Sequence, residues 1–430
     1  MKRTYQTFTI SHFPEFKLQM LNWCNRFNIC AFLDNHHYQL PGHTYECLVG
    51  CGTVDAISAS AGTALQQWQQ WQQTQNDWCF GHFAYDLKNE IENLTTVHPD
   101  RIGFPHLYFF VPRYVFQLQE KQITIGSLEQ DHATVFESIR NDKYQTSTSP
   151  LQLDIRERIS KQDYIEAIES IRQRILRGDC YELNYCMEFY DDAATIQPQQ
   201  VYHQLTELSP NPFSVFYKVN ESHLLCASPE RFLRKKGKQL LSQPIKGTVR
   251  RNLNDAAADE ALKKELFQSS KDRSENVMVV DLVRNDLSRV CVEGSVTVDE
   301  LYGIYSFPQV HQMISTVSGE MKDDVLFADI IRSVFPMGSM TGAPKRRVME
   351  LIDAYEQSAR GLYSGAVGYI TPEGDFDFNV VIRSILYNQT DKYLSYQVGG
   401  GITFYSDPEK EYEECLLKAS AIRRILSDDH

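Results

Sequence analysis

Helical spacing of apolar residues is clearest in the stretch "SKQDYIEAIESIRQRILRGD". Four isoleucines recur there at intervals of three and four residues, which places them on one face of a helix: Ile165, Ile168, Ile171 and Ile175. Ser160 and Asp163 form a capping box at the start of this segment, and Gly178 supplies a typical end. The pattern predicts a helix between Ser160 and Gly178.

Runs typical of β-strands lie on both sides of "KKGK" within "SHLLCASPERFLRKKGKQLLSQPIKGT". Because Gly237 can adopt the positive φ of a tight turn, this segment predicts a β-hairpin. Pairing about the turn sets Glu230 opposite residues near 243, and strand dimensions then place Glu230 within roughly 10 Å of Lys246. An acid and an amine can therefore share one cleft, and a cross-strand ion pair is the alternative that remains open.

Residues 137–153 turn polar, with serine, threonine and proline clustered in "ESIRNDKYQTSTSPLQL", which is typical of a linker. We place a domain boundary there, which gives an N-terminal domain over 1–150 and a second domain over 151–430. In the first domain, "LQQWQQWQQTQ" spaces Leu65, Trp68 and Trp71 for one face of a packed helix.

Two further segments place carboxylates on single helix faces. In "KDRSENVMVVDLVRND" a helix puts Asp272 and Glu275 three residues apart on one side, and "EKEYEECLLKASAIRR" spaces Glu411, Glu414 and Lys418 in a similar way. Such carboxylates repel unless a cation lies between them, and Mg²⁺ is usually bound by one or two carboxylates together with water and substrate. Solvated ion pairs are the alternative for other charges of the first segment: Asp281, Arg284, Asp286 and Arg289.

Two stretches suit the binding of an anion. "QVGGGIT" permits close backbone approach through Gly399, Gly400 and Gly401, and "MGSMTGAPKRR" puts Pro344 at the first position of a predicted helix. The second stretch does not match the P-loop pattern, because two residues separate Gly342 from its lysine and no serine or threonine follows. A Mg-dependent ATPase is therefore a remote alternative.

The composition narrows the class of protein. Apolar residues make up 42% and charged residues 23% of the 430 residues, as in ordinary globular chains, and no secretory signal or run of 18 apolar residues is evident. The net charge of −13 disfavours nucleic acid and anionic membranes as partners. We expect a cytoplasmic protein with reduced thiols.

The histidine- and cysteine-rich stretch matches no standard zinc spacing: His36, His37, His43, Cys47 and Cys51.

Seven motifs together resemble the chorismate-utilising enzyme family in order and spacing over residues 155–428: "ASPERFL", "PIKGT", "KDRSENVMVVDLVRND", "MTGAPKRRVMELID", "GLYSGAVGYI", "VIRSI" and "GGGITFYSDPEKEYEECLLK". Residues 1–150 resemble the N-terminal domain of the family chiefly through "GHFAYDL". The resemblance implies an α+β fold in which large antiparallel β-sheets pack on each other and are flanked by helices, with the site in a cleft between them.

Lys246 relates the chain to one subgroup of this family. The subgroup with "PIKGT" forms 4-amino-4-deoxychorismate for p-aminobenzoate and folate synthesis, whereas anthranilate and isochorismate synthases usually lack this lysine. The resemblance implies that the Lys246 amine attacks C2 of chorismate as the C4 hydroxyl leaves, and that ammonia then enters at C4 and expels the lysine. Such an amine must be neutral, which burial near other cations can arrange. Anthranilate synthase activity is the alternative function.

The resemblance also implies roles for other residues. Glu230 is expected to protonate the leaving hydroxyl. Mg²⁺ is expected to bind Glu275 and Glu414 directly and Glu411 through water. The remaining expected contacts to substrate comprise two cationic side chains, two backbone N–H groups and two hydroxyl residues: Arg383, Lys418, Gly399, Gly401, Thr248 and Ser339.

Two positions depart from patterns found in the family. "GDCYELN" has Glu182 where isochorismate synthases have a water-activating lysine, which weighs against hydration of chorismate. In "VHQMISTVSG", Gln312 stands where a catalytic histidine is frequent, and His311 precedes it. Because no cysteine has the setting of a glutaminase nucleophile, we expect a separate glutamine amidotransferase subunit to supply ammonia.

Overall fold

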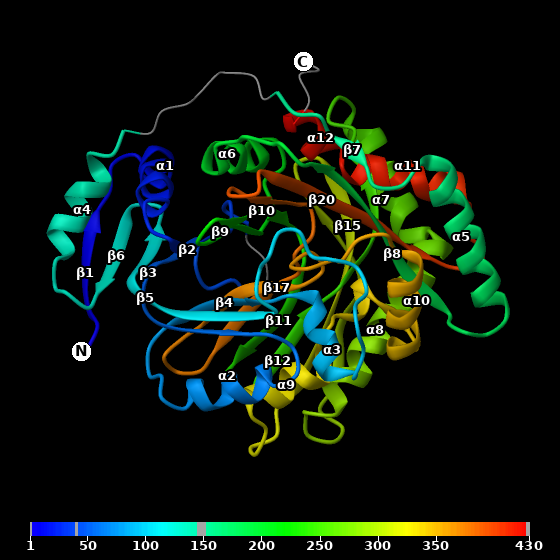
Figure 1. The fold of residues 1–430 in the computed structure, drawn as a ribbon, viewed down its shortest axis with the longest axis horizontal. Coiled ribbons are helices and arrows are strands. Elements are labelled where there is room, and N and C mark those ends of the chain that lie inside the picture. The colour runs from blue at the N-terminus through cyan, green and yellow to red at the C-terminus, as the bar shows by residue number, and fades with distance from the viewer. Residues whose placement is uncertain (1, 39–41, 144–151, 427–430) are drawn as a thin grey trace.

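The computed structural model describes residues 2–38, 42–143 and 152–426 (Figure 1). Within these residues every pairing of named strands is antiparallel, and the pairs form one connected network. The order of pairing divides this network into two arms. They meet at β3 (Cys47–Ala59) and β5 (Leu107–Gln119), two long strands that pair with each other.

The first arm consists, in order of pairing from β3, of β2 (Ile29–Asp34), β9 (Phe213–Val219), β10 (Ser222–Ser228), β19 (Ser384–Asn388), β20 (Tyr393–Ile402) and β8 (Glu182–Asp191). The second arm runs from β5 through β4 (Cys79–Phe83), β17 (Ala366–Ile370), β18 (Phe376–Asn379), β11 (Arg231–Lys236), β12 (Gln239–Gln243) and β15 (Val310–Glu320), with β13 (Ile245–Arg250) and β14 (Thr297–Ser306) also paired to β15. Short strands extend the edges: β1 (Thr4–Thr9), β6 (Gln122–Ser127), β7 (Arg156–Glu157) and β16 (Gly342–Ala343).

Helices flank this network. The helices on the right of Figure 1 come largely from the later part of the sequence. One group packs in a hydrophobic cluster with the first arm: α1 (Phe13–Cys24), α4 (His132–Arg140), α5 (Lys161–Leu176), α6 (Pro198–Leu208), α10 (Lys345–Tyr355), α11 (Pro408–Lys418) and α12 (Ser420–Leu426). The other helical elements are α2 (Ala64–Gln72), η1 (Tyr85–Leu87), α3 (Lys88–Ile91), α7 (Ala256–Gln268), α8 (Ser270–Ser288), α9 (Phe327–Val334) and η2 (Gly338–Met340).

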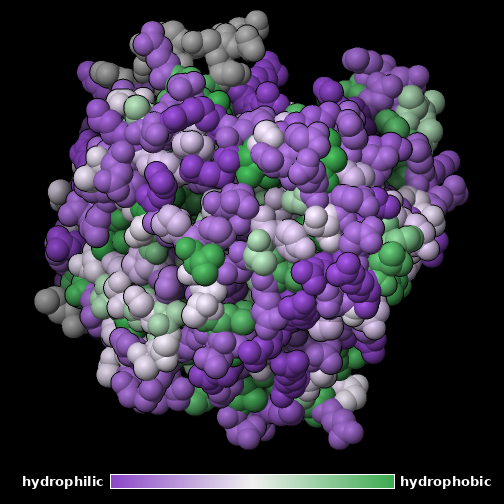
Figure 2. All heavy atoms as spheres, turned by 45° about the vertical axis from the view of Figure 1, so that its right-hand side comes forward, coloured by the Kyte–Doolittle hydropathy of each residue, from purple (hydrophilic) through white to green (hydrophobic). Residues whose placement is uncertain are grey.

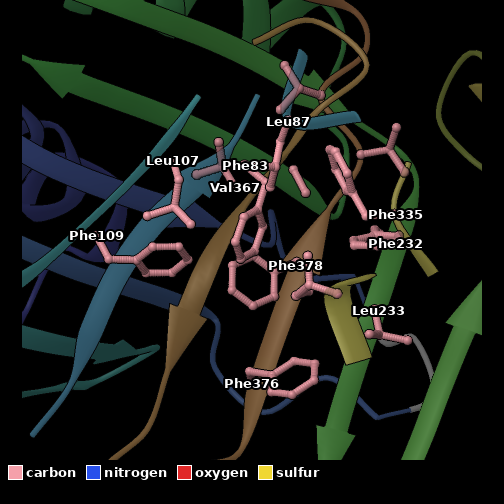
Figure 3. Close-up of a cluster of buried hydrophobic side chains, with 14 of the residues drawn as sticks. Phe83, Leu87, Leu107, Phe109, Phe232, Leu233, Phe335, Val367, Phe376 and Phe378 are labelled. Atoms are coloured by element: carbon pink, nitrogen blue, oxygen red, sulfur yellow. The ribbon is translucent and has the colours of Figure 1, made fainter. Parts of the chain in front are cut away.

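Side chains from both arms share the second hydrophobic cluster, part of which Figure 3 shows. The ring of Phe83 on β4 lies 5.5 Å from Phe378 on β18 and 6.0 Å from Phe335, between ring centroids. Leu65 and Trp68 of α2 are fully buried, which confirms their predicted packing. The predicted α+β fold of packed antiparallel sheets with flanking helices is therefore confirmed.

Two local predictions are confirmed as well. At the start of α5, Ser160 Oγ accepts a hydrogen bond from the N–H of Asp163 at 3.1 Å. Between β11 and β12, Gly237 has a φ of 58°, and Arg231 pairs with Gln243 close to the predicted register. Both features depend on residues only a few positions apart, which is why the sequence pattern reveals them.

Strands on either side of residue 150 pair with each other, as β2 does with β9 and β4 with β17. Much of the predicted linker, residues 144–151, lies outside the described residues, and the division into two domains stays a prediction. Within the described ranges no helix is both long and apolar enough to cross a lipid bilayer.

The face drawn in Figure 2 is mainly hydrophilic, with hydrophobic residues in small separate groups.

Candidate active site

Every predicted site residue lines a single cavity of about 410 Å³: Glu230, Lys246, Thr248, Glu275, Ser339, Arg383, Gly399, Gly401, Glu411, Glu414 and Lys418. The walls of this cavity come from both arms of the sheet and from helices α8 and α11. A cavity of this size accommodates a small organic molecule. The structure thus brings the predicted residues together, while their individual roles stay predictions.

A β-bulge sets the backbone that carries Lys246. The register of β13 against β15 shifts between Ile245 and Thr248, so three steps along β13 correspond to two along β15. The extra residue falls where Gly247 has a φ of 91°, a left-handed conformation that favours glycine. The bulge therefore explains why a glycine follows the lysine in "PIKGT".

The Lys246 amine is buried against a carboxylate. Its side chain is 10% exposed, and Nζ donates a hydrogen bond to Oε1 of Glu182 at 2.5 Å. Burial opposes the charge of Lys246, but the carboxylates of Glu182 and Glu275 raise its pKa above the ordinary value. The expectation of a neutral amine is therefore wrong for the free protein, because the charges that hold this lysine are negative.

Glu230 lies between β10 and β11 and is 4% exposed. Ser339 Oγ donates a hydrogen bond to Oε1 of Glu230 at 2.7 Å. Burial raises the pKa of Glu230 to about 7, although the Ser339 hydroxyl and the charge of Lys246 lower it. A carboxyl group with this pKa can donate a proton near neutral pH. Among the described residues Lys246 forms its ion pair with Glu182, so the alternative of an ion pair with Glu230 is not what the structure shows.

Arg383 presents a guanidinium to the cavity and, within the described residues, makes no ion pair or side-chain hydrogen bond. Burial lowers the pKa of Arg383 to about 10, and the nearby Glu230 opposes this effect. The residue also has a φ of 51°, which is unusual for a residue other than glycine. An unpaired guanidinium at this place favours an anionic ligand, because a carboxylate can accept two of its hydrogen bonds.

Helices α8 and α11 bring the three predicted metal ligands to the cavity, Glu275, Glu411 and Glu414, and Asp272 and Glu413 line it as well. Lys271 Nζ lies 3.3 Å from Oε1 of Glu411 and 3.9 Å from Oε1 of Glu275. Burial raises the pKa of Glu275 to about 7, and its Oε1 is buried without a hydrogen-bond partner. Glu414 behaves differently, since the ammonium of Lys418 at 2.9 Å lowers its pKa to about 2.

These carboxylates suit Mg²⁺ chemically but do not form a closed cage. In the part of the chain that the structure describes, no group of three or more histidine, cysteine, aspartate or glutamate side chains is arranged to hold a metal. This finding covers the carboxylates of α8 and α11 and the histidine- and cysteine-rich stretch alike. The unpartnered oxygen of Glu275, with the hard oxygen donors of Glu411 and Glu414 beside it, still fits an ion that keeps several water or substrate oxygens.

The glycines of β20 make room for charged neighbours. A Cβ atom on Gly401 would lie 2.4 Å from Oε1 of Glu182 and 2.6 Å from Nζ of Lys246. Lys418 donates a hydrogen bond to the carbonyl oxygen of Gly399 at 3.0 Å, so its ammonium already has a protein partner. The backbone contacts from Gly399 and Gly401 to substrate stay predictions.

The structure separates the neighbouring side chains of His311 and Gln312. Gln312 lines the cavity and is 1% exposed, and its Oε1 has no hydrogen-bond partner. His311 instead makes contacts at 2.8 Å with Ser306 Oγ and at 3.1 Å with Asp259 Oδ1. His311 therefore joins α7 to the hairpin of β14 and β15, whereas Gln312 is placed to contact a ligand.

Sequence reasoning missed the partnership of Glu182 with Lys246. A signal was present, because Glu182 stands among apolar residues of the buried strand β8, where a charge needs a partner. Other polar cavity residues carried no comparable signal, since each belongs to a different segment: Asn184, Lys271, Tyr363 and Gln397.

The structure gives no support to phosphate binding at "GAPKRR". Lys345 Nζ lies 2.6 Å from Oδ2 of Asp286, and neither residue lines the large cavity. Pro344 precedes α10 as its N-cap, so the prediction that it occupies the first helical position is wrong by one residue. The lysine that an ATPase would need is already neutralised by a carboxylate.

Residues 42–424 match the family of chorismate binding enzymes, and the chain belongs to that family. It is 34% identical to aminodeoxychorismate synthase component 1 of Bacillus subtilis over 364 residues, which cover 80% of this chain and 76% of that protein. The component 1 protein of Escherichia coli is 33% identical over 352 residues, again 80% of this chain and 76% of that protein. An anthranilate synthase component I-like protein of Synechocystis is 33% identical over 351 residues, 80% of this chain and 72% of that protein.

Solved structures show the same fold. Anthranilate synthase component I of Streptococcus pneumoniae superposes with a TM-score of 0.78 at 25% identity, over 91% of this chain and 95% of that one. The menaquinone-specific isochorismate synthase of Escherichia coli has a TM-score of 0.77 at 18% identity, over 99% of this chain and 95% of that one. The fold alone therefore does not distinguish between these activities.

Proposed function

We propose that this chain is component I of an aminodeoxychorismate synthase, which converts chorismate and ammonia to 4-amino-4-deoxychorismate for p-aminobenzoate and folate synthesis. The observation that carries the proposal is the placement of Lys246 and Glu230, a buried amine and a buried carboxyl that line one cavity. Similarity to the component 1 proteins of Bacillus subtilis and Escherichia coli supports it.

In this reaction the side chains have distinct tasks. Arg383 binds a carboxylate of chorismate, since its guanidinium lacks an anionic partner among the described residues. Lys246 attacks C2 of the ring, and Glu230 protonates the hydroxyl that leaves C4 as water. Ammonia then adds at C4 and expels Lys246. Ser339 keeps the carboxyl of Glu230 in place through its hydrogen bond of 2.7 Å.

We further propose Glu275 and Glu414 as direct Mg²⁺ ligands, with Glu411 acting through water. The ion, when bound, would offset the negative charge of the ring carboxylate. Lys271 contacts Glu411 and lies near Glu275 in this structure, so its ammonium must move aside or share these carboxylates with the ion.

A separate glutamine amidotransferase subunit supplies the ammonia in this proposal. A glutaminase nucleophile must be an accessible thiolate, and every cysteine of the chain is buried. Burial raises the pKa of Cys51, the cysteine whose glycine-rich surroundings come nearest to such a site.

Anthranilate synthase component I is the second candidate, and the similarity to the Synechocystis protein favours it. Mass analysis of the product from chorismate, Mg²⁺ and ammonium separates the two functions. Aminodeoxychorismate synthase adds nitrogen and retains the enolpyruvyl group, whereas anthranilate forms with loss of pyruvate. A product of anthranilate mass would refute the first proposal. Nucleotide hydrolysis that does not depend on chorismate would indicate the remote ATPase alternative.

A further inference from the structure

Glu182 is not among the residues to which the proposed reaction assigns a task, yet it touches the reacting nitrogen. Its Oε1 accepts the hydrogen bond of 2.5 Å from Lys246 Nζ, and the two side chains are 3% and 10% exposed. The other oxygen, Oε2, is buried without a hydrogen-bond partner. Gly401 leaves the space that the pair occupies, because a Cβ atom there would collide with both charged groups.

We propose that Glu182 is a further catalytic residue, the base that takes a proton from the Lys246 ammonium before the amine attacks chorismate. The inference rests on the proposed function, in which Lys246 is the nucleophile. It follows from chemistry, since an ammonium has no lone pair with which to form a bond to carbon. A group in contact with Nζ has to remove one proton, and Glu182 is in that contact.

The proton balance closes over the full reaction. Glu182 takes one proton from the Lys246 ammonium, and the neutral amine forms a bond to C2 while the ring double bonds shift and the C4–O bond breaks. Glu230 gives its proton to the departing oxygen, and water leaves. Ammonia then bonds to C4, the double bonds shift back and the C2–N bond breaks. Glu230 regains a proton from the new ammonium at C4, and Lys246 regains its own from Glu182.

The other acidic groups near Lys246 are less suited to this step. The carboxylates that most strongly raise the pKa of Lys246 are Glu182 on β8, Glu275 on α8 and Glu230 between β10 and β11. On α11, Glu414 and the ammonium of Lys418 also act on the amine, but these two groups pair with each other at 2.9 Å. Glu230 is hydrogen-bonded to Ser339 and is needed in its protonated form for the leaving group. Glu275 makes no ion pair with Lys246 within 4.0 Å among the described residues, and its neighbour there is Lys271. Two carboxyl groups in different surroundings thus divide the acid and base tasks.

The first test needs no substrate. Acetic anhydride acylates only neutral amines, so the rate of acetylation at Lys246, followed by peptide mass spectrometry at pH 7.5, reports how firmly the proton is held. Glu182→Gln should raise this rate at least about tenfold, because a neutral amide holds the ammonium less strongly than a carboxylate. Lys235 on β11 is the reference lysine in the same digest, and its Nζ lies 3.3 Å from Oδ1 of Asp375.

The second test measures turnover of chorismate with the concentration of free ammonia held constant. Glu182→Gln should lower kcat by ~10²–10³ at pH 7. Its kcat should rise about tenfold per pH unit, because solvent then has to remove the proton, whereas the parent should show a much weaker dependence. Glu182→Asp should recover at least about tenfold over the glutamine variant, since it restores a carboxylate.

Faster acetylation of Lys246 together with slower turnover in Glu182→Gln would support Glu182 as the base. If Glu182→Gln turned over as fast as the parent or faster, the proposal would be overturned, because Glu182 would then only keep the Lys246 amine protonated. A loss of turnover with the same pH profile as the parent and no recovery by aspartate would also overturn it, in favour of a positioning role. A parent chain that forms no 4-amino-4-deoxychorismate would refute the proposed function itself, while the acetylation experiment still measures the coupling of Glu182 to Lys246.

Discussion

At the scale of single residues, Lys246 is the first side chain to test. Lys246→Ala should abolish most formation of 4-amino-4-deoxychorismate, because the covalent step requires the amine. Lys235→Ala is the matched control, since it removes another ion-paired lysine of the same sheet network outside the cavity. Thermal unfolding followed by circular dichroism should show that both variants fold. Unchanged kcat/KM in Lys246→Ala would exclude the covalent mechanism.

Replacement of Glu230 by glutamine should raise stability at alkaline pH and lower activity. The folded pKa of Glu230, about 7, exceeds the ordinary 4.5, so the native state holds more protons than the unfolded state between these values. Stability from this group is complete below about pH 4.5 and is lost as pH rises through 7. Glu230→Gln removes that loss, so its Tm should exceed that of the parent at pH 8 and the difference should shrink at pH 5.

The same variant should lose ~10²–10⁴ in kcat, because an amide cannot donate the proton. A rate within threefold of the parent would argue against general acid catalysis by Glu230. Since the expected change in Tm at pH 8 is a gain, unfolding cannot explain the expected loss of activity.

At the scale of elements, the bulge in β13 sets where the lysine points. Gly247→Ala forces a side chain into a φ of 91° and brings its Cβ within 3.0 Å of Asp272. Gly237→Ala is the control, because that turn glycine has a φ of 58° but open space around it. Both changes should cost about 1 kcal/mol of backbone strain, and only Gly247→Ala should also lower kcat, by tenfold or more. Equal kcat values for both variants would show that the bulge does not position Lys246.

Helices α8 and α11 are expected to cooperate through the metal. Glu275→Ala and Glu414→Ala should each raise the Mg²⁺ concentration for half-maximal activity, because each removes one carboxylate from the same ion. Their combined effect should depart strongly from the sum of the single effects. Glu409→Ala is the control on α11, since Glu409 pairs with Lys161 outside the cavity. If calorimetric Mg²⁺ titrations of both variants match the parent, these carboxylates are only charges on helix faces.

At the scale of the whole molecule, the two arms and the helices enclose the cavity proposed to bind chorismate, and the ten cysteines are all buried. The purified chain should therefore convert chorismate with ammonium, and faster at raised pH where more NH₃ is present. It should not use glutamine until an amidotransferase subunit is added. The measurement is product formation with each nitrogen source in a preparation free of other proteins. Glutamine-dependent turnover by this chain alone would contradict the partner proposal.

Local sequence determined the elements that frame the site. The cap at Ser160, the turn at Gly237 and the helical spacing of Glu411 and Glu414 all depend on residues within a few positions of one another, so pattern alone predicts them. The motifs also located the candidate residues, because their order along the chain resembles that of a known family. Residues 42–424 match that family, a longer segment than the motifs indicated.

Only the tertiary structure decided the charge of Lys246 and the orientation of its neighbours. Glu182 and Lys246 are 64 residues apart and meet because β8 and β13 face one cavity, so no local pattern predicts that the lysine is held as an ammonium. The same holds for His311 and Gln312, because the packing of α7 against the β14–β15 hairpin gives His311 a partner in Asp259, whereas Gln312 lines the cavity. Propensity and capping act through nearby residues, whereas the pKa of a buried group depends on whatever distant charges the fold brings beside it.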